Sequence, residues 1–128
     1  MWIKSMKVYK FGGASVKDAS GVRNVLRVLR ELKASEIVVV ISAMGKMTNA
    51  FESLVQSYFD EQEVSGTESL APGVDAQLKS IKAFHLRIIG DLGFEESDAI
   101  HKEIQQILDE ARAFLSTNDS DSYDFVYD

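Results

Sequence analysis

The sequence predicts an α/β fold that opens with a parallel β–α–β unit and continues into a helical segment. Two runs of β-prone residues, 7–11 and 36–42, flank a stretch in which apolar residues recur every three or four positions. A strand, a helix and a second strand in so short a span form a crossover unit, so the two strands should be parallel. Three further amphipathic helical patterns follow after residue 48.

The first strand, 7–11, ends at the pair Gly12-Gly13, which is typical of a strand that runs into a tight loop. Asp18 and Ser20 are candidate N-caps for the helix that follows. That helix is predicted to reach about residue 33, because its apolar side chains share one face: Val22, Val25, Leu26, Leu29 and Leu32.

The second strand, 36–42, is apolar, continuous and β-branched, which is the pattern of a strand buried on both faces. A loop over 43–47 follows, and Thr48 and Asn49 occupy the N-cap position of the next predicted helix. The apolar stripe of that helix comprises Phe51, Leu54, Val55, Tyr58 and Phe59.

Residues 61–73 are predicted to form a loop. The third helix has one apolar face and ends near Gly90 to Gly93; the face comprises Leu78, Ile81, Phe84 and Ile88. The fourth begins at about Ser97 and carries Ile100, Ile104, Ile107, Leu108, Ala111 and Leu115 in register. The aromatic segment 123–128 is interpreted as the beginning of another element.

Two parallel strands make an incomplete sheet, because each strand keeps an exposed edge. We therefore expect residues 1–128 to be the N-terminal portion of a larger α/β domain that is cut short. Residues 1–5 precede the first strand and are interpreted as an N-terminal extension with no assigned function.

Composition excludes several classes of protein. The 128 residues allow one domain, and the absence of Cys excludes a disulfide framework, a thiolate zinc site and a Cys nucleophile. The longest uncharged apolar stretch, 37–45, is shorter than the roughly 18 residues of a membrane helix, and no apolar signal segment follows Met1. The net charge of −6 argues against general nucleic-acid binding. We expect a cytoplasmic protein with neither a membrane nor a nucleic-acid partner.

The charges are divided unevenly along the chain. The first 50 residues hold nine Lys and Arg against three acidic residues, and the remainder holds five against 17. This split predicts that the first 50 residues face an anion. The alternative is that the charged side chains are distributed unevenly over a solvated surface and face no ligand.

Lys10, Gly12 and Gly13 lie at the carboxyl end of the first strand, where open α/β sheets bind ligands. Glycines permit a positive φ and leave backbone N–H groups open to an anion. A lysine just before them can neutralise the charge of a transferring phosphate. The lysine precedes the glycines, so this is not a Walker A loop. An ordinary glycine turn with an exposed lysine is the alternative.

A second loop segment, 41–49, lies at the carboxyl end of the neighbouring parallel strand, at the same edge of the sheet, so the two loops can face one ligand assembly. Ser42 and Thr48 supply hydroxyl groups there, and Gly45 permits a close approach. The N–H groups at the start of the following helix suit a carboxylate or a phosphate. The alternative role of Thr48 or Asn49, a simple helix cap, is compatible with ligand binding.

Together the two loops resemble those of the amino-acid kinase family and, within it, the aspartate kinases. The first loop reads KFGGASV where that family has Lys-Phe-Gly-Gly-Thr-Ser-Val, and the second reads VVVISAMGKMTN where it has Val-Ser-Ala-x-x-x-x-Thr-Asn. The motifs cover residues 7–17 and 37–51, and the order of elements extends the likeness to residue 128.

The resemblance implies a nucleotide site. Lys10 would contact the ATP phosphates and stabilise the transferred phosphoryl group, and Phe11, Gly12 and Gly13 would form the phosphate loop with it. Mg²⁺ would bind through ATP, with no metal ligand supplied by this chain. Ala14 stands where the family has Thr, which removes one hydroxyl group but leaves the backbone cradle.

The resemblance also implies the acceptor. Ser42 and Thr48 would contact aspartate, whose side-chain carboxylate would receive the phosphoryl group in the first step of lysine, threonine and methionine synthesis. The parent protein would be a homo-oligomer. The family's Ser-x-Gly-Glu segment, the second half of its kinase domain and its regulatory ACT domains have no match in these 128 residues, so we expect this chain alone to be inactive.

Two alternatives remain. The chain is compatible with another member of the family, acting on glutamate, acetylglutamate, carbamate or a nucleotide, although Thr48 and Asn49 favour aspartate. A non-catalytic module that binds a partner through residues 48–115 belongs to a different class. His85 and His101 are interpreted as structural or surface residues.

Overall fold

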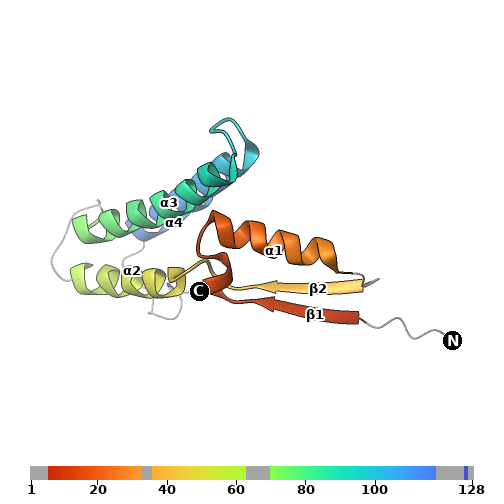
Figure 1. The fold of residues 1–128 in the computed structure, drawn as a ribbon. Coiled ribbons are helices and arrows are strands. Elements are labelled where there is room, and N and C mark those ends of the chain that lie inside the picture. The colour runs from red at the N-terminus through yellow and green to blue at the C-terminus, as the bar shows by residue number, and fades with distance from the viewer. Residues whose placement is uncertain (1–5, 33–35, 63–69, 118–125, 127–128) are drawn as a thin grey trace. The chain divides into compact units, whose positions relative to one another are not determined.

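The structure is a computed structural model that describes residues 6–32, 36–62, 70–117 and 126. The chain divides into two compact units, with the boundary between Met47 and Thr48. Figure 1 shows the elements of both units. The predicted segment 123–128 lies outside the described residues except for residue 126, and so do residues 1–5.

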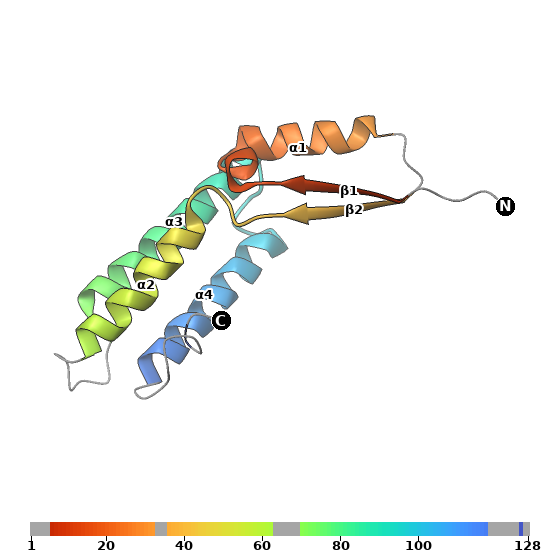
Figure 2. The same ribbon diagram turned by 90° about the horizontal axis from the view of Figure 1, so that it is seen from below.

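The first unit is the predicted β–α–β unit. It contains strand β1 (Met6–Phe11), a 3₁₀ turn η1 (Gly13–Val16), helix α1 (Ala19–Glu31) and strand β2 (Glu36–Ile41). The strands are parallel, with Met6 opposite Glu36 and Phe11 opposite Ile41. Helix α1 runs alongside both strands in both views (Figures 1 and 2). The predicted α/β class and the parallel pairing are therefore confirmed.

Asp18 sets the start of α1. Its carboxylate accepts a hydrogen bond of 2.8 Å from the backbone N–H of Gly21, which satisfies one of the donors that a helix leaves free at its N-terminus. Ser20 lies inside the helix, so of the two candidate caps Asp18 is the one used. The helix ends at Glu31, where the next residue, Leu32, turns to an extended backbone.

The prediction that the second strand is buried on both faces is wrong for the described residues. Half-buried Tyr9 and Val39 alternate with exposed neighbours, so one face of the sheet is covered in part. On the other face Met6 and Val8 are 62% and 65% exposed, and Val38 and Val40 are 42% and 44% exposed. The physical reason is that, within the described part of this unit, a helix runs along only one face of the sheet.

The second unit is helical where the structure describes it, and its core in that part comes from three helices. They are α2 (Met47–Gln62), α3 (Pro72–Leu92) and α4 (Ala99–Thr117). Pro72 suits the first turn of α3, where its missing N–H would have no partner, and Gly93 ends the helix with a φ of 94°. The buried apolar side chains are Leu54, Val55, Tyr58, Val74, Leu78, Ile81, Ile88, Ile89 and Leu115.

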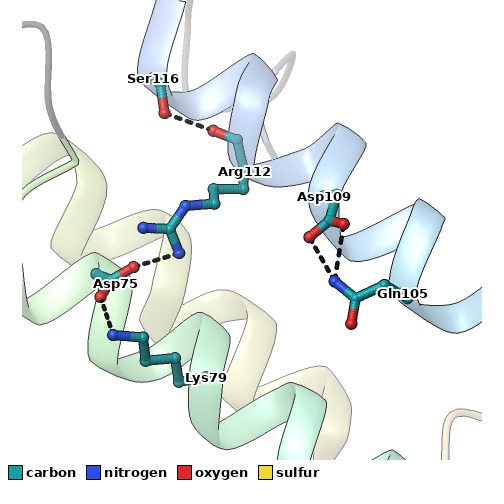
Figure 3. Close-up of polar contacts among 6 residues, drawn as sticks. All are labelled: Asp75, Lys79, Gln105, Asp109, Arg112 and Ser116. Atoms are coloured by element: carbon teal, nitrogen blue, oxygen red, sulfur yellow. Dashed lines mark hydrogen bonds and ion pairs between the residues drawn. The ribbon is translucent and has the colours of Figure 1, made fainter.

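Polar contacts join the three helices to one another. Between α2 and α3, the Gln77 amide donates to the Ser57 hydroxyl at 2.6 Å. Between α3 and α4, the carboxylate of Asp75 pairs with Arg112, and it also meets Lys79 on its own helix at 2.7 Å (Figure 3). These contacts fix which faces of the helices meet.

The predicted stripes are correct in part. On α4 the half-buried side chains recur every three or four residues and lead to buried Leu115, as the sequence predicts. Ile107 is the exception, because it is 62% exposed and lies outside that face. Phe51 on α2 is also exposed. Among the helices described, none has the length and apolar character needed to cross a membrane.

Candidate functional site

The first loop follows β1 directly and leads into η1, whose last residue, Val16, is buried. Lys10 is exposed near the end of the strand, and the backbone continues through Gly12 into η1, where the N–H of Ser15 donates to the Gly12 carbonyl at 2.9 Å. Gly12 has φ −78° and ψ 170°, an extended conformation open to any residue. Neither Gly12 nor Gly13 has a positive φ, so neither residue uses the freedom that glycine permits.

The second loop follows β2 at the same edge of the sheet. The N–H of Ser42 donates to the Phe11 carbonyl at 3.0 Å, which carries the strand pairing one residue beyond β2. Gly45 has a φ of 58°, in the left-handed region that favours glycine. The N–H of Met47 then donates to the Met44 carbonyl at 3.0 Å as α2 begins.

The two loops contact each other through their glycines. The N–H of Gly45 donates to the Gly13 carbonyl at 3.0 Å. A Cβ atom on Gly13 would lie 2.5 Å from the Gly45 carbonyl oxygen and 2.9 Å from that of Ala43, closer than real Cβ atoms come. Glycine at position 13 is therefore required by the second loop. The prediction that both loops lie together at one edge of the sheet is confirmed.

The structure brings five of the six predicted site residues to this edge of the first unit. Lys10, Gly12 and Ser42 are exposed there, whereas Phe11 and Gly13 are half-buried. The sixth, Thr48, is exposed and is the first residue of the second unit. Because α2 begins at Met47, Thr48 and Asn49 lie in its first turn, and their predicted N-cap position is wrong. Binding of a ligand by these six residues stays a prediction.

The sequence did not reveal why position 13 must be a glycine. The sequence favours a phosphate cradle at this residue, but its carbonyl and its empty Cβ position face the second loop. The contact joins residues 32 positions apart, and local sequence carries no signal for such a pairing. The partner of Gly13 in this contact is Gly45, a residue at which the sequence predicts a close approach.

Acidic clusters do not offer a metal site in the described part of the chain. No group of three or more His, Asp or Glu side chains there could hold an ion. Asp18, beside the first loop, already accepts from the Gly21 N–H.

The titratable cluster of the second unit is structural. Asp75 lies between Lys79 and Arg112, and the hydrogen bond from Lys79 is the main cause that holds the pKa of the Asp75 carboxyl below its usual value (Figure 3). Its partners sit on α3 and α4, so the charges serve helix packing. His85 bonds through Nδ1 to the Ile81 carbonyl at 2.8 Å, in keeping with its expected structural role.

A shallow hollow of about 830 Å³ lies between α3 and α4. Its walls combine apolar Leu86 and Phe94 with charges of both signs, Lys82 and Glu95 among them. Its charges point to no single class of ligand, so it is a weaker candidate site than the edge of the sheet.

The chain is similar to a protein family and to individual proteins. The family described as "Amino acid kinase family" matches residues 5–117. Aspartokinase 1, chloroplastic, of Arabidopsis thaliana is 33% identical over 103 residues, which are 79% of this chain and 17% of the relative. Aspartokinase 2, chloroplastic, of the same plant is 34% identical over 102 residues, 77% of this chain and 17% of the relative.

A bacterial relative and a solved structure extend the comparison. The bifunctional aspartokinase/homoserine dehydrogenase of Buchnera aphidicola is 29% identical over 104 residues, 80% of this chain and 12% of the relative. The crystal structure of E. coli aspartokinase III in complex with aspartate and ADP (R-state) shares the fold, with a TM-score of 0.65 and 24% identity over 91% of this chain and 24% of that chain. The chain thus spans less than a quarter of each of these proteins.

Proposed function

Because the chain belongs to the amino acid kinase family, we propose that it is the N-terminal part of the catalytic domain of an aspartate kinase. The reaction transfers the γ-phosphoryl group of ATP to the side-chain carboxylate of aspartate and yields an acyl phosphate and ADP. One observation carries the proposal: the loop that follows Lys10 and Phe11 and the loop that begins at Ser42 are hydrogen-bonded to each other at the carboxyl edge of two parallel strands.

The first loop takes the nucleotide in this proposal. Lys10 is exposed beside Gly12, and a Cβ atom added to Gly12 would meet nothing within 4 Å, which leaves room for a phosphate group against the backbone. The ammonium group of Lys10 neutralises charge on the phosphoryl group as it transfers. Phe11 and Gly13 continue the loop, and Mg²⁺ enters with ATP. The E. coli enzyme was crystallised in complex with ADP, which supports a nucleotide here.

The second loop takes the amino acid. Ser42 and Thr48 supply exposed hydroxyl groups that can donate to a carboxylate. The acceptor carboxylate is already ionised at neutral pH, so the step needs no protein base and depends on alignment and charge neutralisation. The same E. coli complex contains aspartate, which supports this choice of acceptor.

The activity belongs to a longer protein. The chain spans 12–17% of the curated relatives that it matches, so we propose that the 128 residues alone are inactive. A homo-oligomeric parent and a cytoplasmic location are parts of the same proposal. The composition, which includes no Cys and so fits a reducing compartment, supports the location.

A chimaera tests the proposal directly. Residues 6–117 of this chain replace the matching segment of E. coli aspartokinase III, and ATP-dependent hydroxamate formation is measured with aspartate and with glutamate. We expect product with aspartate, none with glutamate, and none with either from the 128-residue chain alone. If product formed with glutamate only, the substrate would be glutamate and not aspartate. A folded chimaera that is silent with both would contradict the proposal.

A further inference from the structure

Adjacent glycines in the first loop have different surroundings. A Cβ atom on Gly12 would meet nothing within 4 Å, and the backbone there is extended. A Cβ atom on Gly13 would strike two carbonyl oxygens of the second loop, those of Ala43 and Gly45. Gly12 therefore leaves open space beside the loop, whereas the space beside Gly13 is already filled by protein.

The contact at Gly13 continues the pairing of the two strands. The N–H of Ser42 donates to the carbonyl of Phe11, the last residue of β1, and the N–H of Gly45 donates to the carbonyl of Gly13 in the first loop; both distances are 3.0 Å. The positive φ of Gly45 turns the backbone so that its N–H reaches Gly13. These bonds use backbone atoms alone, so the contact needs no ligand to form.

We infer that Gly13 is a positioning residue that fastens the second loop to the first and so fixes the distance between the two substrates. The role in catalysis rests on the proposed function, whereas the fastening itself does not. Because the two loops are joined before any substrate binds, the protein sets the distance between ATP and aspartate. A displacement of one substrate by about 1 Å would lower the rate roughly 100-fold. The side chain at position 13 is excluded by the protein's own second loop.

Hydrogen exchange tests the fastening without any activity. In the 128-residue chain the Gly45 amide should exchange slowly, because it is bonded to Gly13. The matched variants are Gly13→Ala and Gly12→Ala, which add the same methyl group to neighbouring positions. We expect Gly13→Ala to remove the protection of the Gly45 amide and Gly12→Ala to keep it. Retained protection in Gly13→Ala overturns the inference. Rapid exchange of the Gly45 amide in the unmodified chain also overturns the inference. This second measurement decides the question even if Gly13→Ala does not fold.

Kinetics of the active chimaera test the positioning role. Gly13→Ala should lower kcat and raise KM for both ATP and aspartate, with a loss of about 100-fold in kcat/KM. Gly12→Ala should change the kinetics for ATP and leave KM for aspartate unaltered. A change confined to ATP in Gly13→Ala would assign the residue to nucleotide binding alone and overturn the positioning role. If the unmodified chimaera is silent, the proposed function fails while the exchange result stands.

Discussion

Asp75 on α3 pairs with Arg112 on α4, and this ion pair joins two helices that the chain connects through the turn at Gly93 (Figure 3). A second cation, Lys79, meets the same carboxylate at 2.7 Å. The pKa of Asp75 is lowered by these contacts, chiefly by the hydrogen bond from Lys79. A lowered pKa means that the folded state favours the ionised carboxyl more than the unfolded chain does.

The stabilisation from Asp75 should therefore depend on pH. It is fully present above the ordinary pKa of 3.8 and is lost as the pH falls through the lower value of the folded state. Asp75→Asn should lower the midpoint of thermal unfolding at pH 7, and the difference from the unmodified chain should shrink at pH 3. Asp109→Asn is the matched control, because Asp109 is exposed and bonds to Gln105 on its own helix. Equal effects of the two substitutions at pH 7 would contradict the role of the ion pair.

Removal of the cap of α1 should destabilise the first unit. Asp18→Ala leaves the Gly21 N–H without its 2.8 Å partner, and the loss of such a cap costs about 1 kcal/mol. Asp18→Ser should recover most of this loss, since serine also accepts from the first turn. Urea unfolding measures the difference. A cost from Ser20→Ala equal to that from Asp18→Ala would argue against the cap.

Two isoleucines of the helical unit should respond very differently to truncation. Ile81 is 2% exposed, and its replacement by Ala should cost about 2–5 kcal/mol through lost burial and a cavity. Ile107 is 62% exposed, and the same replacement should change the free energy of unfolding by less than about 0.5 kcal/mol. Denaturant titration of both variants gives the comparison. Similar losses at both positions would mean that Ile107 is buried in solution.

Lys10 should be needed for the rate of phosphoryl transfer. In the chimaera, Lys10→Ala should lower kcat by about 100- to 1000-fold, the usual loss when one group that stabilises transition-state charge is removed. Lys7→Ala is the matched control, because Lys7 is an exposed lysine of the same strand outside the proposed site. Hydroxamate formation measures both. Unchanged activity in Lys10→Ala would remove this residue from the mechanism.

Much of the fold follows from local sequence. The β–α–β unit was predictable because each element carries its own periodicity, and parallel pairing follows from a crossover connection. The place of the two loops at one edge follows from that pairing alone. The cap at Asp18 was predictable for the same reason, since its partner Gly21 is three residues away.

What the sequence did not reveal depends on contacts between distant residues. Position 13 has no room for a side chain because the carbonyl oxygens of Ala43 and Gly45 lie where a Cβ atom would be. Folding alone brings these two residues close to Gly13. The exposure of β2 was missed because apolar, β-branched residues predict a strand but do not supply the elements that cover it. Ile107 keeps the helical spacing yet lies outside the buried face, since the packing of α3 against α4 decides which part of an apolar stripe is used.

The exposed apolar side chains on one face of the described sheet favour association between molecules of this chain. Met6, Val8, Val38 and Val40 present apolar surface on a sheet that has two strands within the described residues. The charge of −6 opposes that association at neutral pH. Near the isoelectric point of about 4.9 this repulsion vanishes, so an acid titration of the chain passes through its least soluble pH before it reaches the pKa of Asp75. Dilute samples, transferred quickly from pH 7 to pH 3, avoid that region.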